Sequence, residues 1–216
     1  MNVTLGQTYL ESVVKRLMTY KILGDMTFTQ LEEKDFHFVP VMPASYSVEP
    51  PPPTAPSAPA GANDGPAAIA IANASLSSSN SIAVIIRHLN GNMLSRWTNF
   101  LTEDGEKPGR NRDEEFSEPT AGKDQLLTLW EKGWTCLLDT LRGLKEEDLL
   151  KTITIRSEPL LAIDAINRQL AHYPHHVGQI VYIGKMIRGA AWQSLSISKG
   201  ASQAFNQFME DKHARR

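Results

Sequence analysis

Histidine is the residue type in this chain whose spacing best fits chemistry at a bound ion. Six histidines occur, and two of them, His172 and His176, are spaced i, i+4. On a continuous helix, side chains at that spacing lie on one face with Cβ atoms about 5–6 Å apart, so two imidazoles can share one divalent cation. The alternative is a pair of partly buried or surface histidines without a ligand, because the His-x-x-x-His pattern alone is weakly specific.

A third histidine, His88, lies in the apolar stretch 82–89 and shares a helical face with Ile85, Leu89 and Asn92. A buried imidazole needs a polar partner. One interpretation is a single core histidine bonded to a carbonyl or hydroxyl. The other is that His88 meets the i, i+4 pair across the fold. Three neutral imidazoles would then leave a fourth position open and would suit Zn, Ni, Co or Fe.

Polar side chains at helical spacing from these histidines are candidates for binding a substrate. Arg168 lies one turn before His172, Asn92 lies one turn after His88, and Arg96 lies a further turn along. Such groups could hold a carboxylate or phosphate near an ion. The alternative is that each arginine pairs with a surface acid.

Four long segments carry the helical periodicity needed to position these residues, at about residues 5–23, 81–101, 123–144 and 160–188. Ser79 or Asn80 is the expected N-cap of the second. The alternating run 151–156 predicts one or two short strands between the third and fourth helices. The pattern predicts an all-α fold, a four-helix bundle with long crossover connections, formed by residues 1–216 as one domain.

The connections between these segments are unequal. Residues 42–79 hold eight of the thirteen prolines, many Ala and Ser, and two charges, so we expect a flexible insertion. Residues 102–122 form a long, charged loop. Its acidic residues either form a solvated face or pair with Arg110 and Arg112.

Pro174 lies between two of the candidate ligands and bears on whether they share a face. Proline lacks an N–H and clashes with the carbonyl four residues back, at a cost of about 3 kcal/mol in a helix interior. The apolar pattern keeps its helical phase from Leu170 to Val177 and Val181. We therefore expect a kinked but continuous helix, with a helix end at Pro174 as the alternative.

Composition excludes several classes of protein. Lys+Arg 22 against Asp+Glu 24 gives a net charge of −2, which disfavours binding to nucleic acid. The sequence contains no run of about 18 apolar residues, so it predicts no membrane span. The first ten residues lack the pattern of a signal peptide, and a single cysteine, Cys136, allows no intrachain disulfide, so we expect a cytoplasmic protein.

Two stretches, residues 80–116 and 165–185, resemble the DinB-like superfamily and, within it, the branch called DUF1572. The resemblance covers almost the whole chain except residues 42–79. It implies an up-down-down-up four-helix bundle, usually a homodimer, that binds nickel, zinc or another divalent metal through three histidines. These match His88, His172 and His176, the last followed by Val177-Gly178-Gln179. Pro174 and Gly109, where an aromatic residue is more usual, depart from the pattern.

The resemblance also implies candidate functions. Related proteins include S-transferases that use a small thiol, so a metal-dependent thiol transferase acting on a small electrophile is the first hypothesis. The alternative is a non-enzymatic, metal-binding or interaction protein of the same fold. The shared chemistry of the first hypothesis is a metal with an open position, which lowers the pKa of a bound thiol.

Overall fold

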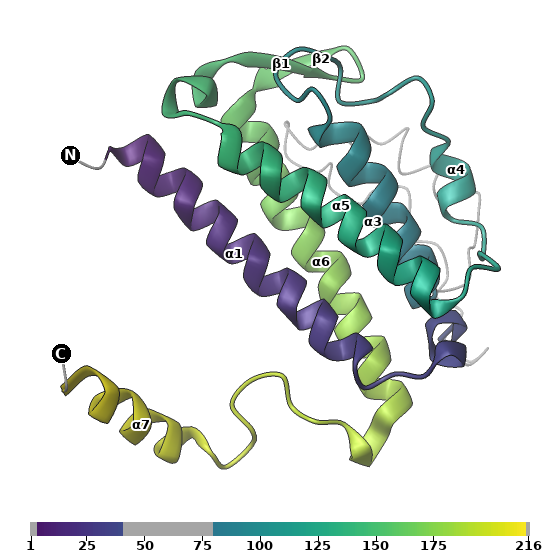
Figure 1. Cartoon of the computed structure of the whole chain (residues 1–216), viewed down its shortest axis with the longest axis vertical. Coiled ribbons are helices and arrows are strands. Elements are labelled where there is room, and N and C mark those ends of the chain that lie inside the picture. The colour runs from purple at the N-terminus through teal and green to yellow at the C-terminus, as the bar shows by residue number, and fades with distance from the viewer. Residues whose placement is uncertain (1–3, 41–79, 215–216) are drawn as a thin grey trace, which may run out of the picture. The chain divides into compact units, whose positions relative to one another are not determined.

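The computed structural model describes residues 4–40 and 80–214 (Figure 1). The predicted insertion at 42–79 lies outside the described residues. The elements of the described part, in chain order, are α1 (Leu5–Phe28), η1 (Glu33–His37), α3 (Ile82–Trp97), α4 (Arg112–Glu115), α5 (Lys123–Gly143), η3 (Glu146–Leu150), β1 (Thr152–Ile155), β2 (Glu158–Leu161), α6 (Ala162–Arg188), η4 (Gly189–Ala191) and α7 (Ser202–Ala214). None of these helices is both long and apolar enough to cross a bilayer.

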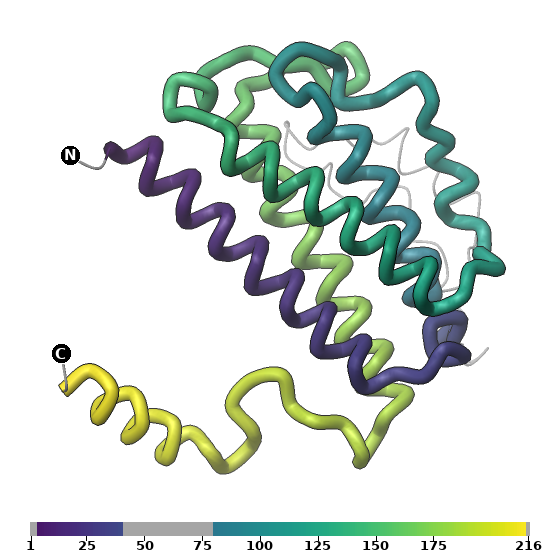
Figure 2. Tube along the Cα trace, in the orientation of Figure 1, coloured from purple at the N-terminus to yellow at the C-terminus, as the bar shows by residue number. Residues whose placement is uncertain are grey.

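The four long helices form the predicted all-α bundle. Contacts join α3 to α5, α5 to α1, α1 to α6 and α6 to α3, which closes a ring around a shared core. In Figures 1 and 2, α1 and α6 run in one direction, and α3 and α5 run in the other. The first two long helices, α1 and α3, therefore lie diagonally opposite each other, and so do the last two, α5 and α6. Long connections are needed for this arrangement, as the unequal linkers predicted.

Side chains and apolar faces define the helix ends and the core. Thr4 and Gln7 form a capping box at the start of α1. The Oγ of Ser81 accepts a hydrogen bond from the N–H of Val84, so Ser81 caps α3, one residue after the predicted Asn80. The largest fully buried side chains come mainly from the inward faces of the bundle and include Leu17, Ile85, Met93, Trp97, Leu126, Trp130, Trp134 and Tyr173.

Helix α6 passes through Pro174 without a break, as the apolar phase predicted. The buried residues Ile166, Tyr173, Val177 and Ile180 lie on both sides of the proline. Burial of this continuous face offsets the backbone hydrogen bond that Pro174 cannot make. As a result His172 and His176 remain one helical turn apart on the same face.

A hairpin and a C-terminal helix are among the elements outside the four bundle helices. The strands β1 and β2 pair antiparallel with Ile155 opposite Glu158. As predicted, β1 lies within the alternating run 151–156, whereas β2 takes residues 158–161, which overlap the expected start of the fourth helix. At the C-terminal end of the described residues, α7 extends to Ala214. None of the residues of α7 is buried. The helix therefore has no core-facing apolar side from which the sequence could have predicted it as a bundle helix.

Candidate metal centre

The structure brings the three predicted histidines together between α3 and α6. His88 is 4% exposed and extends from α3, whereas His172 and His176 are half-buried on α6. Nε2 of His172 lies 3.4 Å from Nε2 of His88 and 3.1 Å from Nε2 of His176. One ring nitrogen from each residue falls within a group whose members are all within 4.8 Å of one another. Ligand atoms 2.0–2.1 Å from a tetrahedral ion are about 3.4 Å apart, so the 3.4 and 3.1 Å separations from His172 are close to those of ligands to one ion.

The opposite nitrogen of each ring faces an oxygen acceptor. Nδ1 of His88 lies 3.1 Å from Oε2 of Glu115, and Nδ1 of His172 lies 3.1 Å from Oε1 of Gln169. Nδ1 of His176 lies 2.8 Å from Oε1 of Gln179. Each oxygen can accept a hydrogen bond from Nδ1–H, and a ring that carries its proton there leaves the Nε2 lone pair free. Metal-ligating histidines commonly have such a second hydrogen bond.

Burial keeps the two α6 imidazoles neutral. Removal from water, with the positive charge that His176 and His88 would carry, lowers the pKa of His172 to about 3. Removal from water likewise lowers the pKa of His176 to about 4, although the hydrogen bond with Gln179 opposes the shift. At neutral pH both rings are therefore unprotonated, which is the form that binds a metal ion.

These lowered pKa values predict acid sensitivity of the metal-free protein. The folded state binds fewer protons than the unfolded chain between the ordinary histidine value of 6.5 and about 3. The contribution of these neutral histidines to the free energy of unfolding is therefore complete above pH 6.5 and is lost as the pH falls toward 3. We expect the Tm, measured with a chelator present, to fall between pH 7.5 and 5.0, and to fall less in the His172→Gln variant. Equal losses in both proteins would contradict this account.

Each of the two interpretations of the acidic loop between α3 and α5 holds for part of it: Glu103, Asp113 and Glu114 are exposed, whereas Glu115 is buried. Glu115, at the end of α4, is 7% exposed and accepts two hydrogen bonds from Arg110, from Nε to Oε1 and from Nη2 to Oε2, each at 2.8 Å. Arg110 is thus the pairing partner that the alternative interpretation named. Arg112 instead lies over the ring of Phe116, 5.0 Å from its centroid.

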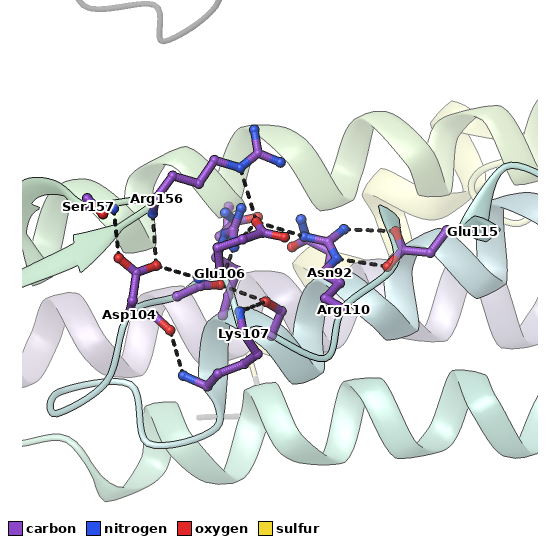
Figure 3. A network of polar contacts seen from close by, with 12 residues as sticks. Asn92, Asp104, Glu106, Lys107, Arg110, Glu115, Arg156 and Ser157 are labelled. Carbon is purple, nitrogen blue, oxygen red and sulfur yellow. Dashed lines mark hydrogen bonds and ion pairs between the residues drawn. The ribbon is translucent and has the colours of Figure 1, made fainter. Parts of the chain in front are cut away.

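Glu106 connects this loop to the hairpin (Figure 3). Its Oε2 lies 3.0 Å from Nη1 of Arg96, 3.1 Å from Nε of Arg156 and 3.5 Å from Nη1 of Arg110. The neighbouring Asp104 accepts hydrogen bonds from the backbone N–H groups of Arg156 and Ser157, at 2.8 and 2.7 Å. The loop is therefore held in place by charge-assisted hydrogen bonds at several points.

Two of the three predicted substrate-binding side chains make contacts within the protein. Oδ1 of Asn92 accepts a hydrogen bond from the Tyr173 hydroxyl at 3.0 Å, and Asn92 is 6% exposed. Arg96 is 5% exposed and also donates to the carbonyl of Gly105. Arg168 is exposed on α6, one turn before His172, so its charge is available to a ligand from solution. A role in binding substrate stays a prediction for all three.

Sequence reasoning missed several residues that contact the histidines. Gln169 lies three residues before His172 and Gln179 three residues after His176, a helical spacing that could have predicted their contacts. Phe116 packs against His88 with ring centroids 4.8 Å apart, and no local signal marks this contact. Gly109, the departure from the expected aromatic, is exposed, and a Cβ atom there would meet nothing within 4 Å.

Comparison with known proteins places this fold and site in a family. The sequence model described as "Protein of unknown function (DUF1572)" matches residues 67–201. The chain belongs to the DUF1572 family. The matched range includes all of α3 and α6, which carry the three histidines of this DUF1572 protein, and α4, which ends at Glu115. No curated protein and no solved structure matches the chain.

Proposed function

We propose that this DUF1572 protein binds one divalent transition-metal ion through the Nε2 atoms of His88, His172 and His176. The observation that carries the proposal is the convergence of three Nε2 atoms while each Nδ1 faces an oxygen acceptor. Without a cation, three lone pairs directed at one point repel each other. Three imidazole nitrogens suit zinc, nickel, cobalt or iron(II).

The donor set favours an ion that acts on an exogenous ligand. Three histidines leave at least one coordination position to a water or another small molecule. An ion so held would lower the pKa of a bound thiol or water and thereby supply a nucleophile at neutral pH. The three ligands are neutral, and the Glu115 carboxylate that contacts His88 is paired with Arg110. The site therefore favours an anionic ligand such as a thiolate.

The resemblance to DinB-like S-transferases suggests the reaction class. We propose a metal-dependent transferase that joins a small thiol to a small electrophile. The chain itself would hold the ion in a half-buried position, keep the three rings neutral, and present the Arg168 guanidinium to an anionic part of the thiol. The non-enzymatic alternative keeps the metal and has no turnover.

Metal analysis tests the first part of this proposal. Protein purified without a histidine tag, stripped with a chelator and titrated with Zn²⁺ or Ni²⁺, should bind one equivalent, and stoichiometry by elemental analysis and calorimetry checks it. Binding should raise the Tm, since an ion that binds the folded state stabilises it by mass action. An uptake well below one equivalent for every divalent ion tried would refute the site.

A thiol panel then separates the enzyme from the binding protein. Metal-loaded protein is mixed with an electrophile such as monochlorobimane and, in turn, with bacillithiol, mycothiol and glutathione. Faster conjugation with one thiol than in buffer or with the metal-free protein supports the transferase. Rates equal to buffer with every thiol would favour the non-enzymatic alternative.

A further inference from the structure

The buried carboxylate of Glu115 contacts His88, the one α3 ligand of the proposed metal site. It is also paired with Arg110, and Figure 3 shows that pair. The Glu115 side chain is 10% exposed and that of Arg110 is 4% exposed. The two groups form a bidentate pair, while Oε2 of Glu115 also lies 3.1 Å from Nδ1 of His88. Arg110 therefore fixes the position of both carboxylate oxygens with respect to the imidazole.

Gly91 provides the space in which this carboxylate sits. Gly91 lies on α3, three residues after His88, so the two positions share a helical face. A Cβ atom built on Gly91 would overlap Oε1 of Glu115 and would lie 2.7 Å from its Cδ. The carboxylate thus packs directly on the α3 backbone, and any residue other than glycine at position 91 would displace it.

The contacts of Arg110 extend beyond Glu115 and limit its movement. Its Nη1 lies 3.5 Å from Oε2 of Glu106, which also pairs with Arg96 on α3 and Arg156 in the hairpin. The loop residue that orients Glu115 is therefore linked to two separate elements of the fold. Such a linked set of ion pairs holds its side chains in fixed rotamers, whereas a single surface ion pair would not.

We propose that Glu115, held by Arg110 and seated against Gly91, is the positioning residue that fixes the Nδ1–H tautomer and ring orientation of His88. A carboxylate can only accept, so it requires the proton on Nδ1 and leaves Nε2 with a free lone pair. The tautomer part of the inference concerns the metal-free protein, and its effect on affinity rests on the proposed metal site.

The first test measures the tautomer directly, without metal. The ¹⁵N and ¹H correlations of labelled imidazoles in chelator-treated protein should show His88 as Nδ1–H. In Glu115→Ala and in Gly91→Ala the Nε2–H form should appear, because the acceptor is removed or displaced. Gly91→Ala retains every charged group and improves helix propensity. It therefore tests the position of the Glu115 carboxylate even if Glu115→Ala folds poorly.

The matched control is Glu118→Gln. Glu118 is also a carboxylate in contact with a histidine, with Oε1 2.8 Å from Nδ1 of His37, but it lies outside the cluster. This variant should leave the His88 signals unchanged. An Nδ1–H form of His88 that persists in Glu115→Ala and Gly91→Ala would overturn the proposal, whatever the metal data show.

The second test measures metal affinity by chelator competition, together with the Co²⁺ absorption spectrum. Removal of an outer-shell partner of a metal ligand commonly weakens binding by 10–100-fold. We expect a loss of that order for Glu115→Ala and Gly91→Ala, a smaller loss for Glu115→Gln, which keeps an acceptor oxygen, and none for Glu118→Gln. A Co²⁺ spectrum and an affinity within threefold of wild type for the first two variants would contradict the proposal. Wild-type protein that binds no metal would instead refute the proposed function and leave the tautomer test to decide this inference.

Discussion

Replacement of His172 by alanine is expected to lower the affinity for a divalent ion by at least about a hundredfold and to leave the helical fold intact. Its Nε2 lies between the other two, 3.4 Å from that of His88 and 3.1 Å from that of His176. The loss should exceed the 10–100-fold effect typical of an outer-shell residue, because a coordinating atom itself is removed. The bundle should persist, since the apolar faces of its long helices dominate its stability.

His175 provides the matched control for this prediction. It lies on the same helix turn, but its Nε2 accepts a hydrogen bond from the Gln179 amide at 3.3 Å and lies outside the cluster. His175→Ala should bind metal with near wild-type affinity. The two variants are compared by chelator competition, with circular dichroism to check helix content. Similar affinities for His172→Ala and wild type would remove His172 from the ligand set.

The largest expected effect on stability is at Trp134. This side chain is fully buried on α5, in edge contact with Trp130 and Tyr173 at centroid distances of 5.3 and 6.2 Å. Truncation of a buried tryptophan to alanine removes apolar contacts and leaves a cavity, which typically costs about 3–5 kcal/mol. We expect a loss of this size in the free energy of unfolding of Trp134→Ala, measured by denaturant titration.

Trp134→Phe separates the packing from the indole N–H. Among the described residues, Nε1 of Trp134 has no hydrogen-bond partner. Phenylalanine keeps an aromatic ring and removes that buried donor, whose burial is unfavourable. Its cost should therefore be well below that of the alanine variant. Equal costs for the two variants would show that ring packing is not the main contribution.

Hydrophobic periodicity predicted the helices of the bundle well because the core imposes it. The prediction for the third segment, 123–144, differs by one residue from Lys123–Gly143. The second segment ends earlier than predicted, at Trp97 instead of about residue 101. The C-cap Thr98 has an extended backbone and the following Asn99 has φ 50°, so the helix ends although Leu101 continues the apolar pattern. Backbone conformation at such a position is not encoded in hydropathy.

The candidate metal centre was predictable to the extent that it follows from helical spacing. His172 and His176 follow from an i, i+4 pattern, and His88 from a polar residue on an apolar face. Glu115 was not predictable in this way, because it is 27 residues from His88 in the chain and reaches it through an irregular loop. The formal charges of that loop are equally compatible with a solvated surface, so only the folded loop shows which acids are buried.

The hairpin turn has a consequence for the order in which the protein folds. Arg156 and Ser157 have φ values of 55° and 65°, and residues with a Cβ adopt this conformation at an energetic cost, so this two-residue turn lacks the Asn-Gly propensity that nucleates hairpins locally. Its N–H groups are instead bound by Asp104, about fifty residues earlier in the chain. Closure of the turn therefore depends on a contact with a large loop-closure entropy. We infer that the turn closes only after the loop that carries Asp104 has docked on α3.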